Sequence, residues 1–377
     1  MFISGIPNFL IELIIRFYKE YFMTQADLNE EKLMELTGKV FENVSAAGSL
    51  LIAYLGDQAG VYSALDENGP CSVEVLASKT KLDERYLLEW LSANSAMGYI
   101  TYHEDSHEFS LSPEQAAIFA HEGEPTCMQG LFQGIVAQYA THDVALDVFK
   151  TGRGRPWEEH HDCCFCGTDR FFRPIYVTNL LEHWIPSLDG MKSKLETGAT
   201  VADIGCGLGS SSILMAKTFP NSKIYGYDFH EPSIVQARNK AAAEGVTNIE
   251  FAVSDAKNIP EKGYDFACIF DALHDMGDPV GVSKAILNTL NDDGTFMLVE
   301  PFANDELKDN LNIQSGLFYA FSTLICVPTS RSQEVGLQLG AQAGEKRLRS
   351  VLNEAGFSNI ERRCLEIESN IVLEAKA

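Results

Sequence analysis

The residues whose types and spacing point most directly to chemistry form a glycine loop. Residues 201–212 read VADIGCGLGSSS, with Gly205, Gly207 and Gly209 at alternate positions after an apolar run. Glycine adopts left-handed backbone angles without strain, so such a loop turns sharply from a strand into a helix and lets a ligand approach the backbone. A dinucleotide loop is spaced G-x-G-x-x-G. This loop reads G-x-G-x-G without a lysine to meet a phosphate, and it therefore predicts a site for a cationic nucleoside without phosphate groups.

Acidic residues mark the ends of the next apolar runs along the chain. The second and third expected strands end at Asp228 and Asp255, and the fourth is expected to run through Asp271 to His274 and Asp275. A carboxylate after the second strand can accept hydrogen bonds from both hydroxyls of a ribose, and it repels a phosphate there. The carboxyl ends of the strands line one ligand crevice in a doubly wound sheet. We therefore expect these acids to converge although they are far apart in sequence.

A histidine follows the fourth apolar run, and a glutamate ends the fifth. His274 lies in ALHDM, and Glu300 closes GTFMLVE. A hydroxyl acceptor must lose a proton as it attacks an alkyl donor, and histidine suits this task because its ordinary pKa is about 6.5, which predicts a rate that rises at about pH 6 to 7. Glu300 would orient His274 or the acceptor. The alternatives are a histidine that caps the next helix and a glutamate that faces solvent.

Residues 196–377 resemble a class I S-adenosylmethionine-dependent methyltransferase, with ADIGCGLG as the cofactor loop. The sequence HDM resembles the HDW motif of plant-type O-methyltransferases, with Met276 in place of the tryptophan, and the resemblance implies that His274 is the general base. It also implies S-adenosylmethionine as the cofactor. The implied contacts are Asp203, Gly205, Cys206 and Gly207 at the methionine portion, Asp228 and Phe229 at the ribose and adenine, Asp255 and Ala256 at the adenine amino group, and Asp271 close to the methionine end.

Residues 23–125 resemble a winged-helix module. Ser72 and Asp83 are expected helix starts, and the stretch after Gly98, YITYHEDSHEFSLS, is expected to be the hairpin wing. The module has 18 acidic and 5 basic residues, a net charge of −13, whereas DNA binding requires a basic face. A similar module precedes the catalytic domain of plant-type small-molecule O-methyltransferases, where it serves dimerisation. We therefore expect a homodimer that does not bind nucleic acid.

Residues 126–195 are predicted to be a helical connector that covers the cofactor. The run HHDCCFC, residues 160–166, could bind zinc, but structural zinc sites usually have a second, separated ligand pair, and none is visible. We predict no metal and interpret the run as a loop before a helix. Phe171, Phe172 and Tyr176 on that helix are expected to cover the cofactor.

The apolar stretch 305–330 is predicted to be a helical substrate lid between the fifth and sixth strands. Phe318, Tyr319, Phe321 and Leu324 indicate an apolar acceptor, with core packing on the sheet as the alternative. A helix, a stop at Gly356 and two final strands are expected after the lid.

The composition is that of a two-domain soluble protein, with 377 residues, 45% of them apolar and 22% charged. A net charge of −24 argues against nucleic acid or an anionic membrane as a partner. Nine cysteines, an odd number, favour reduced thiols and a cytoplasmic location. Residues 1–22 are apolar but are interrupted by Glu12 and Arg16. Either translation starts at Met23 or this extension is an amphipathic helix that packs on a partner.

These observations predict an α/β protein. We expect a Rossmann-like class I methyltransferase sheet with helices on both faces in residues 196–377, after an extension (1–22), a mostly helical winged-helix domain (23–125) and the connector (126–195). The expected function is methyl transfer from S-adenosylmethionine to a small-molecule acceptor, with a hydroxyl favoured and N- and C-methylation open. The alternatives are a winged-helix regulator that binds a small ligand and a nicotinamide oxidoreductase, which the glycine spacing disfavours.

Overall fold

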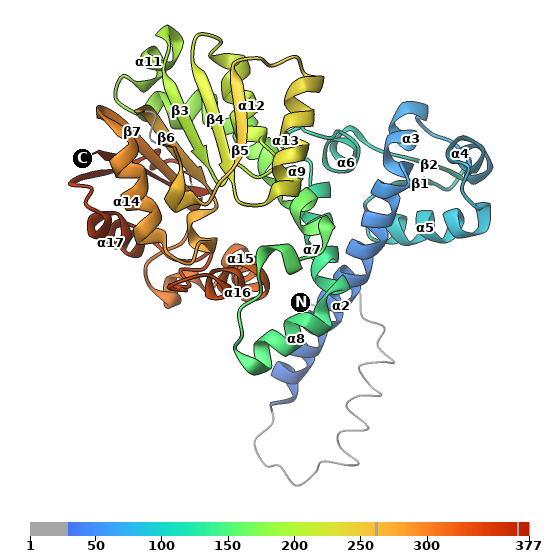
Figure 1. The fold of residues 1–377 in the computed structure, drawn as a ribbon. Helices are drawn as coiled ribbons and strands as arrows, with labels where there is room; N and C mark the ends of the chain where they lie inside the picture. The colour runs from blue at the N-terminus through green and yellow to red at the C-terminus, as the bar shows by residue number, and fades with distance from the viewer. Residues whose placement is uncertain (1–28, 261–262, 368, 377) are drawn as a thin grey trace. The chain divides into compact units, whose positions relative to one another are not determined.

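The computed structural model describes residues 29–260, 263–367 and 369–376 (Figure 1). The chain divides into two compact units between His121 and Glu122. The expectation for residues 1–22 lies outside the described residues. No described helix is long and apolar enough to cross a membrane.

The N-terminal unit consists of helices and one short hairpin, as predicted. Its elements are α2 (Glu30–Gln58), α3 (Val61–Asn68), α4 (Val73–Thr80), α5 (Glu84–Ala96), β1 (Thr101–His103), β2 (Glu108–Ser110) and α6 (Pro113–Phe119). Ser72 is the N-cap of α4, and the Asp83 carboxylate caps α5 by accepting a hydrogen bond from the Tyr86 N–H at 3.0 Å. The antiparallel pair of β1 and β2 forms the expected wing.

The connector is helical as expected, but its helix α9 begins earlier in the sequence than predicted. Its elements are α7 (Gln129–Ala140), α8 (His142–Thr151), α9 (Asp162–Asn179), a π-helical turn (Leu180–Trp184), α10 (Ile185–Ser187) and α11 (Met191–Thr197). The interpretation of HHDCCFC as a loop is wrong from Asp162 onward. His161 caps α9 by accepting a hydrogen bond from the Cys163 N–H at 3.1 Å, so the three cysteines of this run are helical.

A seven-stranded sheet forms the centre of the C-terminal unit, in the order β5-β4-β3-β6-β7-β9-β8. Its strands are β3 (Thr200–Ile204), β4 (Lys223–Asp228), β5 (Ile249–Val253), β6 (Tyr264–Phe270), β7 (Leu290–Pro301), β8 (Asn359–Arg363) and β9 (Asn370–Lys376). The first five strands of that order are parallel, and β9 is antiparallel to both β7 and β8. The order reverses between β3 and β6, which is where an open α/β sheet forms its ligand crevice.

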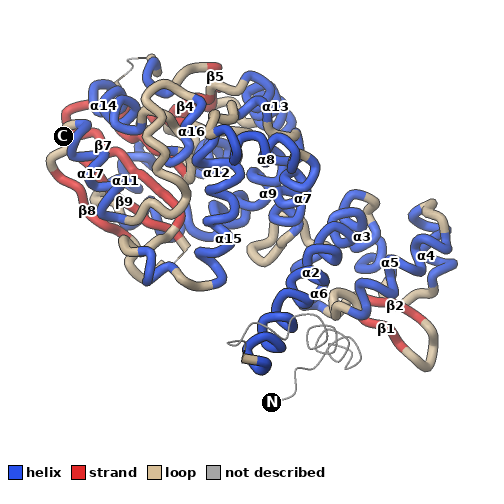
Figure 2. Tube along the Cα trace, turned by 90° about the horizontal axis from the view of Figure 1, so that it is seen from below, coloured by secondary structure: helices blue, strands red, loops and turns tan. Residues whose placement is uncertain are grey.

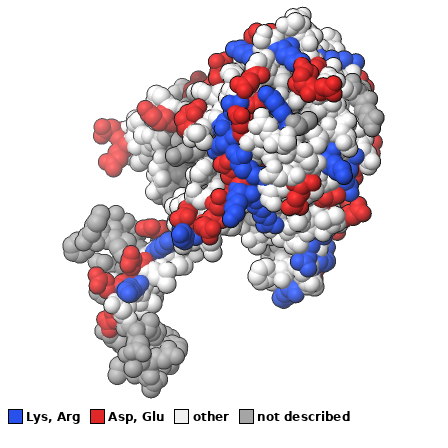
Figure 3. Space-filling view, turned by 90° about the vertical axis from the view of Figure 1, so that its left-hand side faces the viewer, with Lys and Arg blue, Asp and Glu red and all other residues white. Residues whose placement is uncertain are grey.

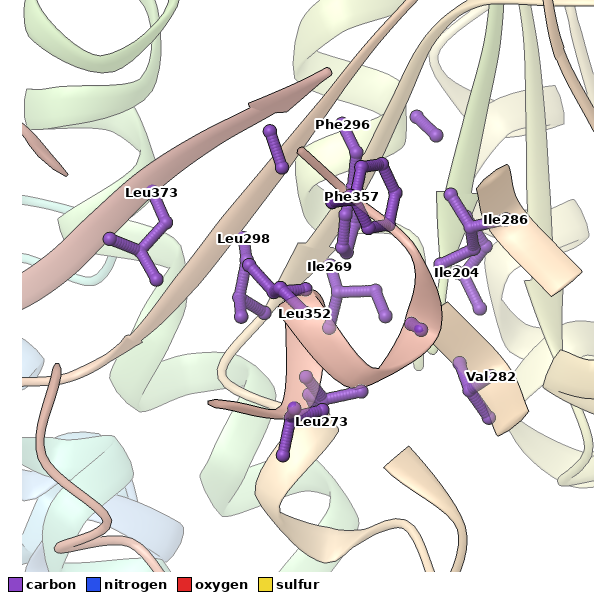
Figure 4. Close-up of a cluster of buried hydrophobic side chains, with 14 of the residues drawn as sticks. Ile204, Ile269, Leu273, Val282, Ile286, Phe296, Leu298, Leu352, Phe357 and Leu373 are labelled. Carbon is purple, nitrogen blue, oxygen red and sulfur yellow. The ribbon is translucent and has the colours of Figure 1, made fainter. Parts of the chain in front are cut away.

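Helices cover both faces of this sheet, as predicted (Figure 2). Helices α11 and α12 (Ser210–Thr218) pack on one face, and α13 (Glu231–Ala243) packs beside α12. Helices α14 (Pro279–Thr289) and α17 (Glu345–Ala355) pack on the other face, where Figure 4 shows their side chains meeting those of the strands. Because successive strand residues point to opposite faces, burial of both faces explains the continuous apolar runs in the sequence.

The expected lid lies between β7 and α17. It contains α15 (Ile313–Phe321), a π-helical turn (Ser322–Cys326) and α16 (Val327–Ser332). The helical character of this stretch is as predicted, and both predicted final strands follow Gly356.

Candidate functional site

A cavity of about 430 Å³ lies at the carboxyl ends of β3, β4 and β6. Most of the residues predicted to contact the cofactor line it, although they come from four separate segments of the chain. These residues are Gly205, Cys206, Gly207, Asp228, Phe229, Asp255, Ala256 and Asp271. Asp203, His274 and Glu300 do not line this cavity. Asp203 contacts Ser211 and His274 contacts Asp275, both of which line it, and Glu300 lies behind His274.

The glycine loop has the backbone geometry that its sequence predicts. Gly205, Gly207 and Gly209 have φ values of +73°, +52° and +81°, in the left-handed region. A Cβ atom on Gly209 would lie 2.6 Å from the ring of Phe251, whereas one on Gly207 would meet no atom within 4 Å. The third glycine therefore allows α12 to pack closely on the sheet, and Gly205 and Gly207 leave the cavity open.

Asp228 fastens the glycine loop to the second strand. Its carboxylate accepts hydrogen bonds from the Gly207 N–H at 2.9 Å and from the His230 N–H at 2.8 Å. Burial raises the pKa of Asp228, and these backbone hydrogen bonds partly offset that rise. Each carboxylate oxygen has a further lone pair that can accept a hydrogen bond from a ligand hydroxyl.

Asp203 lies beneath the loop. Its Oδ2 accepts hydrogen bonds from the Ser211 and Ser212 hydroxyls at 2.7 and 2.5 Å, and burial raises the pKa of Asp203 to about 6. In this position Asp203 holds the first turn of α12, whose N–H groups point toward the loop.

Asp271 presents a buried carboxylate with one unused oxygen. Its Oδ1 accepts a hydrogen bond from Asn370 Nδ2 at 2.9 Å, whereas Oδ2 is buried without a partner. The residue has φ +49°, an uncommon conformation for a residue with a side chain. Burial raises its pKa well above the ordinary value, and Glu300 adds to that rise. A buried carboxylate of this kind suits a cationic ligand group, such as the amino group of a bound methionine portion.

His274 is fixed by Glu300. The imidazole Nδ1 lies 2.5 Å from Glu300 Oε2, and Glu300 Oε1 accepts a hydrogen bond from the Leu273 N–H at 2.9 Å. The Leu273 side chain is fully buried in the core drawn in Figure 4. A carboxylate held in this way fixes both the orientation and the tautomer of the ring.

The other nitrogen of His274 faces a second acid. Nε2 lies 3.4 Å from Asp275 Oδ1, and Cys326 is close enough for one ligand atom of each of the three residues to lie within 4.8 Å of the others. Burial lowers the pKa of His274, but Glu300 and Asp275 outweigh burial and raise it well above 6.5. The ordinary pKa on which the expected rise in rate at about pH 6 to 7 rests therefore does not apply to His274 in this structure, and we expect the rise at higher pH. Asp275, and not His274, lines the cavity.

Aromatic residues of the connector cover the cavity. Phe172 and Tyr176 line it, whereas Phe171 does not. Trp157 and Phe165 also line it, with their ring centroids 5.2 Å apart. Asp169 on α9 accepts hydrogen bonds from Ser210 Oγ at 2.6 Å and from Lys240 Nζ at 2.8 Å, so that it fastens α9 to α12 and α13.

The lid residues expected to meet an acceptor lie elsewhere. Phe318, Phe321 and Leu324 pack in a cluster with Phe165 of the connector, and not on the sheet as the core-packing alternative expected. Tyr319 lines a second cavity. In the HHDCCFC run, His160 Nε2 lies 3.2 Å from Thr329 Oγ1, and Cys164 is buried beside Gln138.

Sequence reasoning missed the partners that complete the site. Cys326 lies in the lid turn, 52 residues after His274, and nothing in LICVP marks it. Asn370 opens the last strand and comes 99 residues after Asp271. Asp275 was visible beside His274, but its place on the cavity wall depends on the short 3₁₀ turn that contains both residues.

Comparisons with known proteins agree with this architecture. A family model described as a methyltransferase domain matches residues 195–356, and one described as an Rv2258c-like winged HTH domain matches residues 46–121. The mitomycin 7-O-methyltransferase MmcR superposes with a TM-score of 0.70 at 18% identity, covering 93% of this chain and 100% of that one. Human N-acetylserotonin methyltransferase, solved with S-adenosylmethionine, gives 0.69 at 14% identity, with 93% and 99% covered.

Curated relatives match only part of the chain. A sterol 24-C-methyltransferase of Gibberella zeae is 29% identical over 187 residues, 47% of this chain and 46% of the relative. An RNA methyltransferase of Bacillus cereus is 35% identical over 26% of this chain and 21% of its own length. The chain thus spans less than half of either relative. It combines a winged-helix domain with a class I S-adenosylmethionine-dependent methyltransferase domain, as predicted.

Proposed function

We propose that the protein transfers the methyl group of S-adenosylmethionine to a hydroxyl of a small-molecule acceptor. The observation that carries this proposal is the convergence on one cavity of the glycine loop, the Asp271 carboxylate with its unpartnered Oδ2, and the Asp275 carboxylate in front of His274. A cofactor and an acid–base group beside the same cavity are what in-line methyl transfer to a hydroxyl requires.

The cavity residues fit the parts of the cofactor. S-adenosylmethionine supplies an activated methyl group on a cationic sulfur. In the proposal, Asp271 and the loop at Gly205–Gly207 hold the methionine portion. Asp228 accepts hydrogen bonds from the ribose hydroxyls, and Asp255 and Ala256 face the adenine. Asp203 supports the loop through α12 instead of contacting the cofactor.

We propose that His274 is the base that receives the proton of the acceptor hydroxyl. In the resting protein, Glu300 and Asp275 favour the imidazolium, so the ring must first lose a proton to solvent before it can act as a base. Glu300 then stabilises the imidazolium that forms as the acceptor hydroxyl is deprotonated. Because Asp275 lines the cavity and lies 3.4 Å from Nε2, we place the path of the proton along Asp275.

An apolar, aromatic acceptor suits the walls of the cavity. Trp157, Phe165, Phe172 and Tyr176 line it. One fold neighbour is named a mitomycin 7-O-methyltransferase and another an N-acetylserotonin methyltransferase, which supports a small-molecule acceptor. All nine cysteines of this chain are free thiols, which supports a cytoplasmic enzyme. We further propose that the enzyme is a homodimer.

The decisive experiment incubates the purified protein with methyl-labelled S-adenosylmethionine and fractions of a small-molecule extract. We expect label in an organic-extractable product, and loss of that label with His274→Ala but not with Lys217→Gln, a surface control. Label that appears only in nucleic acid or protein, or in no fraction, would contradict the proposal.

A regulator that binds DNA is the second candidate, because the N-terminal match is described as a winged HTH domain. The acidic charge of that domain disfavours it. On the face drawn in Figure 3, basic side chains are interspersed with acidic ones and form no broad basic surface. Salt-sensitive, sequence-specific retention of DNA would favour the regulator.

A further inference from the structure

A second cavity, distinct from the site described above, lies on the other side of α16. Its volume is about 500 Å³. Helix α16 separates the two cavities, because Thr329 lines the first, whereas Val327, Pro328 and Arg331 line the second. We call the second cavity the arginine cavity.

The charge of the arginine cavity is opposite to that of the chain. Three arginines line it, Arg153, Arg331 and Arg347, and no aspartate or glutamate does. The whole chain has 53 acidic and only 29 basic residues. A lining whose charged residues are all cationic is therefore unusual for this protein. It would attract an anion locally, although the molecule as a whole repels anions.

Two of these guanidinium groups are not neutralised by acids. Arg331 Nη1 donates to Gln338 Oε1 at 3.4 Å, and Arg347 Nη2 donates to the Leu337 and Gln338 carbonyls at 3.2 and 3.5 Å. Within the part of the chain that the structure describes, neither forms an ion pair. A guanidinium has five N–H donors, so both retain donors for a ligand. Arg153, in contrast, is paired with Asp147 and Glu159.

The rest of the lining is largely apolar. Val148, Phe149, Tyr319, Val327 and Leu339 contribute to the walls. Close packing builds this wall, because a Cβ atom on Gly154 would lie 2.3 Å from the Ser332 backbone, and the Arg155 N–H donates to the Pro328 carbonyl at 2.8 Å. The segment 152–155 is thus seated directly on α16.

We propose that the arginine cavity binds a small organic anion, in which a carboxylate, sulfonate or phosphate meets Arg331 and Arg347 and an apolar or aromatic body fills the space beside Phe149 and Tyr319. The two parts act together. The arginines select for a negative charge. The apolar body adds free energy of binding by burying apolar surface, which an anion without such a body cannot supply to offset the repulsion from a strongly acidic protein. This inference does not depend on the proposed methyl transfer.

A matched pair of probes tests the proposal. Anilinonaphthalene sulfonate is an aromatic anion, and N-phenylnaphthylamine is the same body without the sulfonate. The full-length protein is first saturated with S-adenosylhomocysteine to occupy the cofactor cavity, and binding is then followed by fluorescence. We expect the sulfonate to bind more tightly than the amine, and its affinity to fall with rising salt.

The variant R331Q/R347Q should weaken binding of the sulfonate by about tenfold to a hundredfold and leave binding of the amine unchanged. The control R85Q/K217Q removes two positive charges elsewhere and should bind like the wild type. Both arginines of the cavity are exposed, and circular dichroism checks that the variant folds. Equal affinity for both probes, sulfonate binding that is seen without S-adenosylhomocysteine but lost in its presence, or unchanged sulfonate binding by R331Q/R347Q would overturn the proposal.

Discussion

His274 has an acid at each ring nitrogen, and this arrangement determines the pH dependence of the proposed reaction. Because Glu300 and Asp275 raise the pKa of His274 well above 6.5, the neutral imidazole becomes available only in more alkaline solution. With saturating cofactor, we expect kcat to rise with pH through a value above the ordinary histidine pKa. Glu300→Gln should lower kcat and also shift that rise to lower pH, since it removes the charge that favours the imidazolium. A pH–rate profile that is the same in both proteins would show that Glu300 does not act through His274.

Removal of the imidazole tests its role directly. His274→Ala should lower kcat by about 10²- to 10⁴-fold, the range expected for a general base. Calorimetry should show nearly unchanged affinity for S-adenosylhomocysteine, because His274 does not line the cavity. Wild-type turnover by this variant would instead assign His274 a structural role and indicate an acceptor that needs no base.

Asp228 is the residue on which the ribose assignment depends. Asp228→Ala removes the acceptor of the proposed ribose hydroxyls and of the Gly207 N–H, so affinity for S-adenosylhomocysteine should fall by about a hundredfold or more. Asp228→Asn retains the shape and one acceptor oxygen and should lose less. Isothermal calorimetry measures the affinity of both variants for S-adenosylhomocysteine, and equal affinity of the wild type and the alanine variant would contradict the ribose assignment.

Asp203 should make the stability of the ligand-free protein depend on pH. Burial raises its folded-state pKa to about 6, above the unfolded value of about 3.9. Between these values the folded state holds the proton and the unfolded state releases it, so the contribution of Asp203 to stability falls as pH rises from about 4 to 6. Asp203→Asn should remove this dependence. The difference in Tm between variant and wild type should therefore shift in favour of the variant over this range, and a constant difference would contradict the prediction.

At the scale of elements, the junction between the glycine loop and α12 allows no side chain at its third glycine. Gly209→Ala combines a left-handed φ of +81° with a Cβ atom 2.6 Å from Phe251. We expect a loss of roughly 1–3 kcal/mol in unfolding free energy, together with weaker binding of S-adenosylhomocysteine. Gly245→Ala is the matched control, because Gly245 has φ +68° with no atom within 4 Å of the added Cβ. Equal destabilisation by both would show that the backbone angle, and not the packing on Phe251, governs the site.

The same scale shows which elements the sequence could predict. The strands were predictable because both faces of the sheet are covered, so β3, β4, β6 and β7 read as apolar runs. Their ends were less so: the run expected to continue to Asp275 ends as a strand at Phe270 and turns into a 3₁₀ helix. The start of α9 escaped prediction because its cap is a histidine, a residue that sequence rules do not associate with helix starts.

The candidate site was predictable only in part, for a physical reason. Asp228, Asp255 and Asp271 could be placed because each lies at or just after the end of a strand, and strand ends meet at one edge. Cys326 and Asn370 reach the site from distant elements, and their positions depend on tertiary packing that local pattern does not encode. The pKa of His274 was misjudged for the same reason, since it depends on a glutamate 26 residues away.

At the scale of the molecule, α2 exposes apolar side chains at helical spacing. Leu36, Val40, Val44, Leu51 and Leu55 are between 41% and 66% exposed, which is unusual for a solvated helix face. We expect this face to join two copies of the chain. Light scattering should give the mass of a dimer, and Val44→Lys should shift it toward the monomer whereas the neighbouring Asn43→Lys should not. A monomeric wild-type protein would refute the dimer.

The last strand of the sheet has a consequence for how the protein is made. Strand β9 follows β8 in sequence but lies between β7 and β8, and Asn370 at its start holds Asp271. During synthesis on the ribosome, β7 therefore has no neighbour on that side until residues 370–376 have emerged. The cofactor pocket and the sheet are completed by the same late event. A nascent chain paused before residue 370 would present an open apolar strand edge to chaperones and would have no finished pocket for a ligand to stabilise.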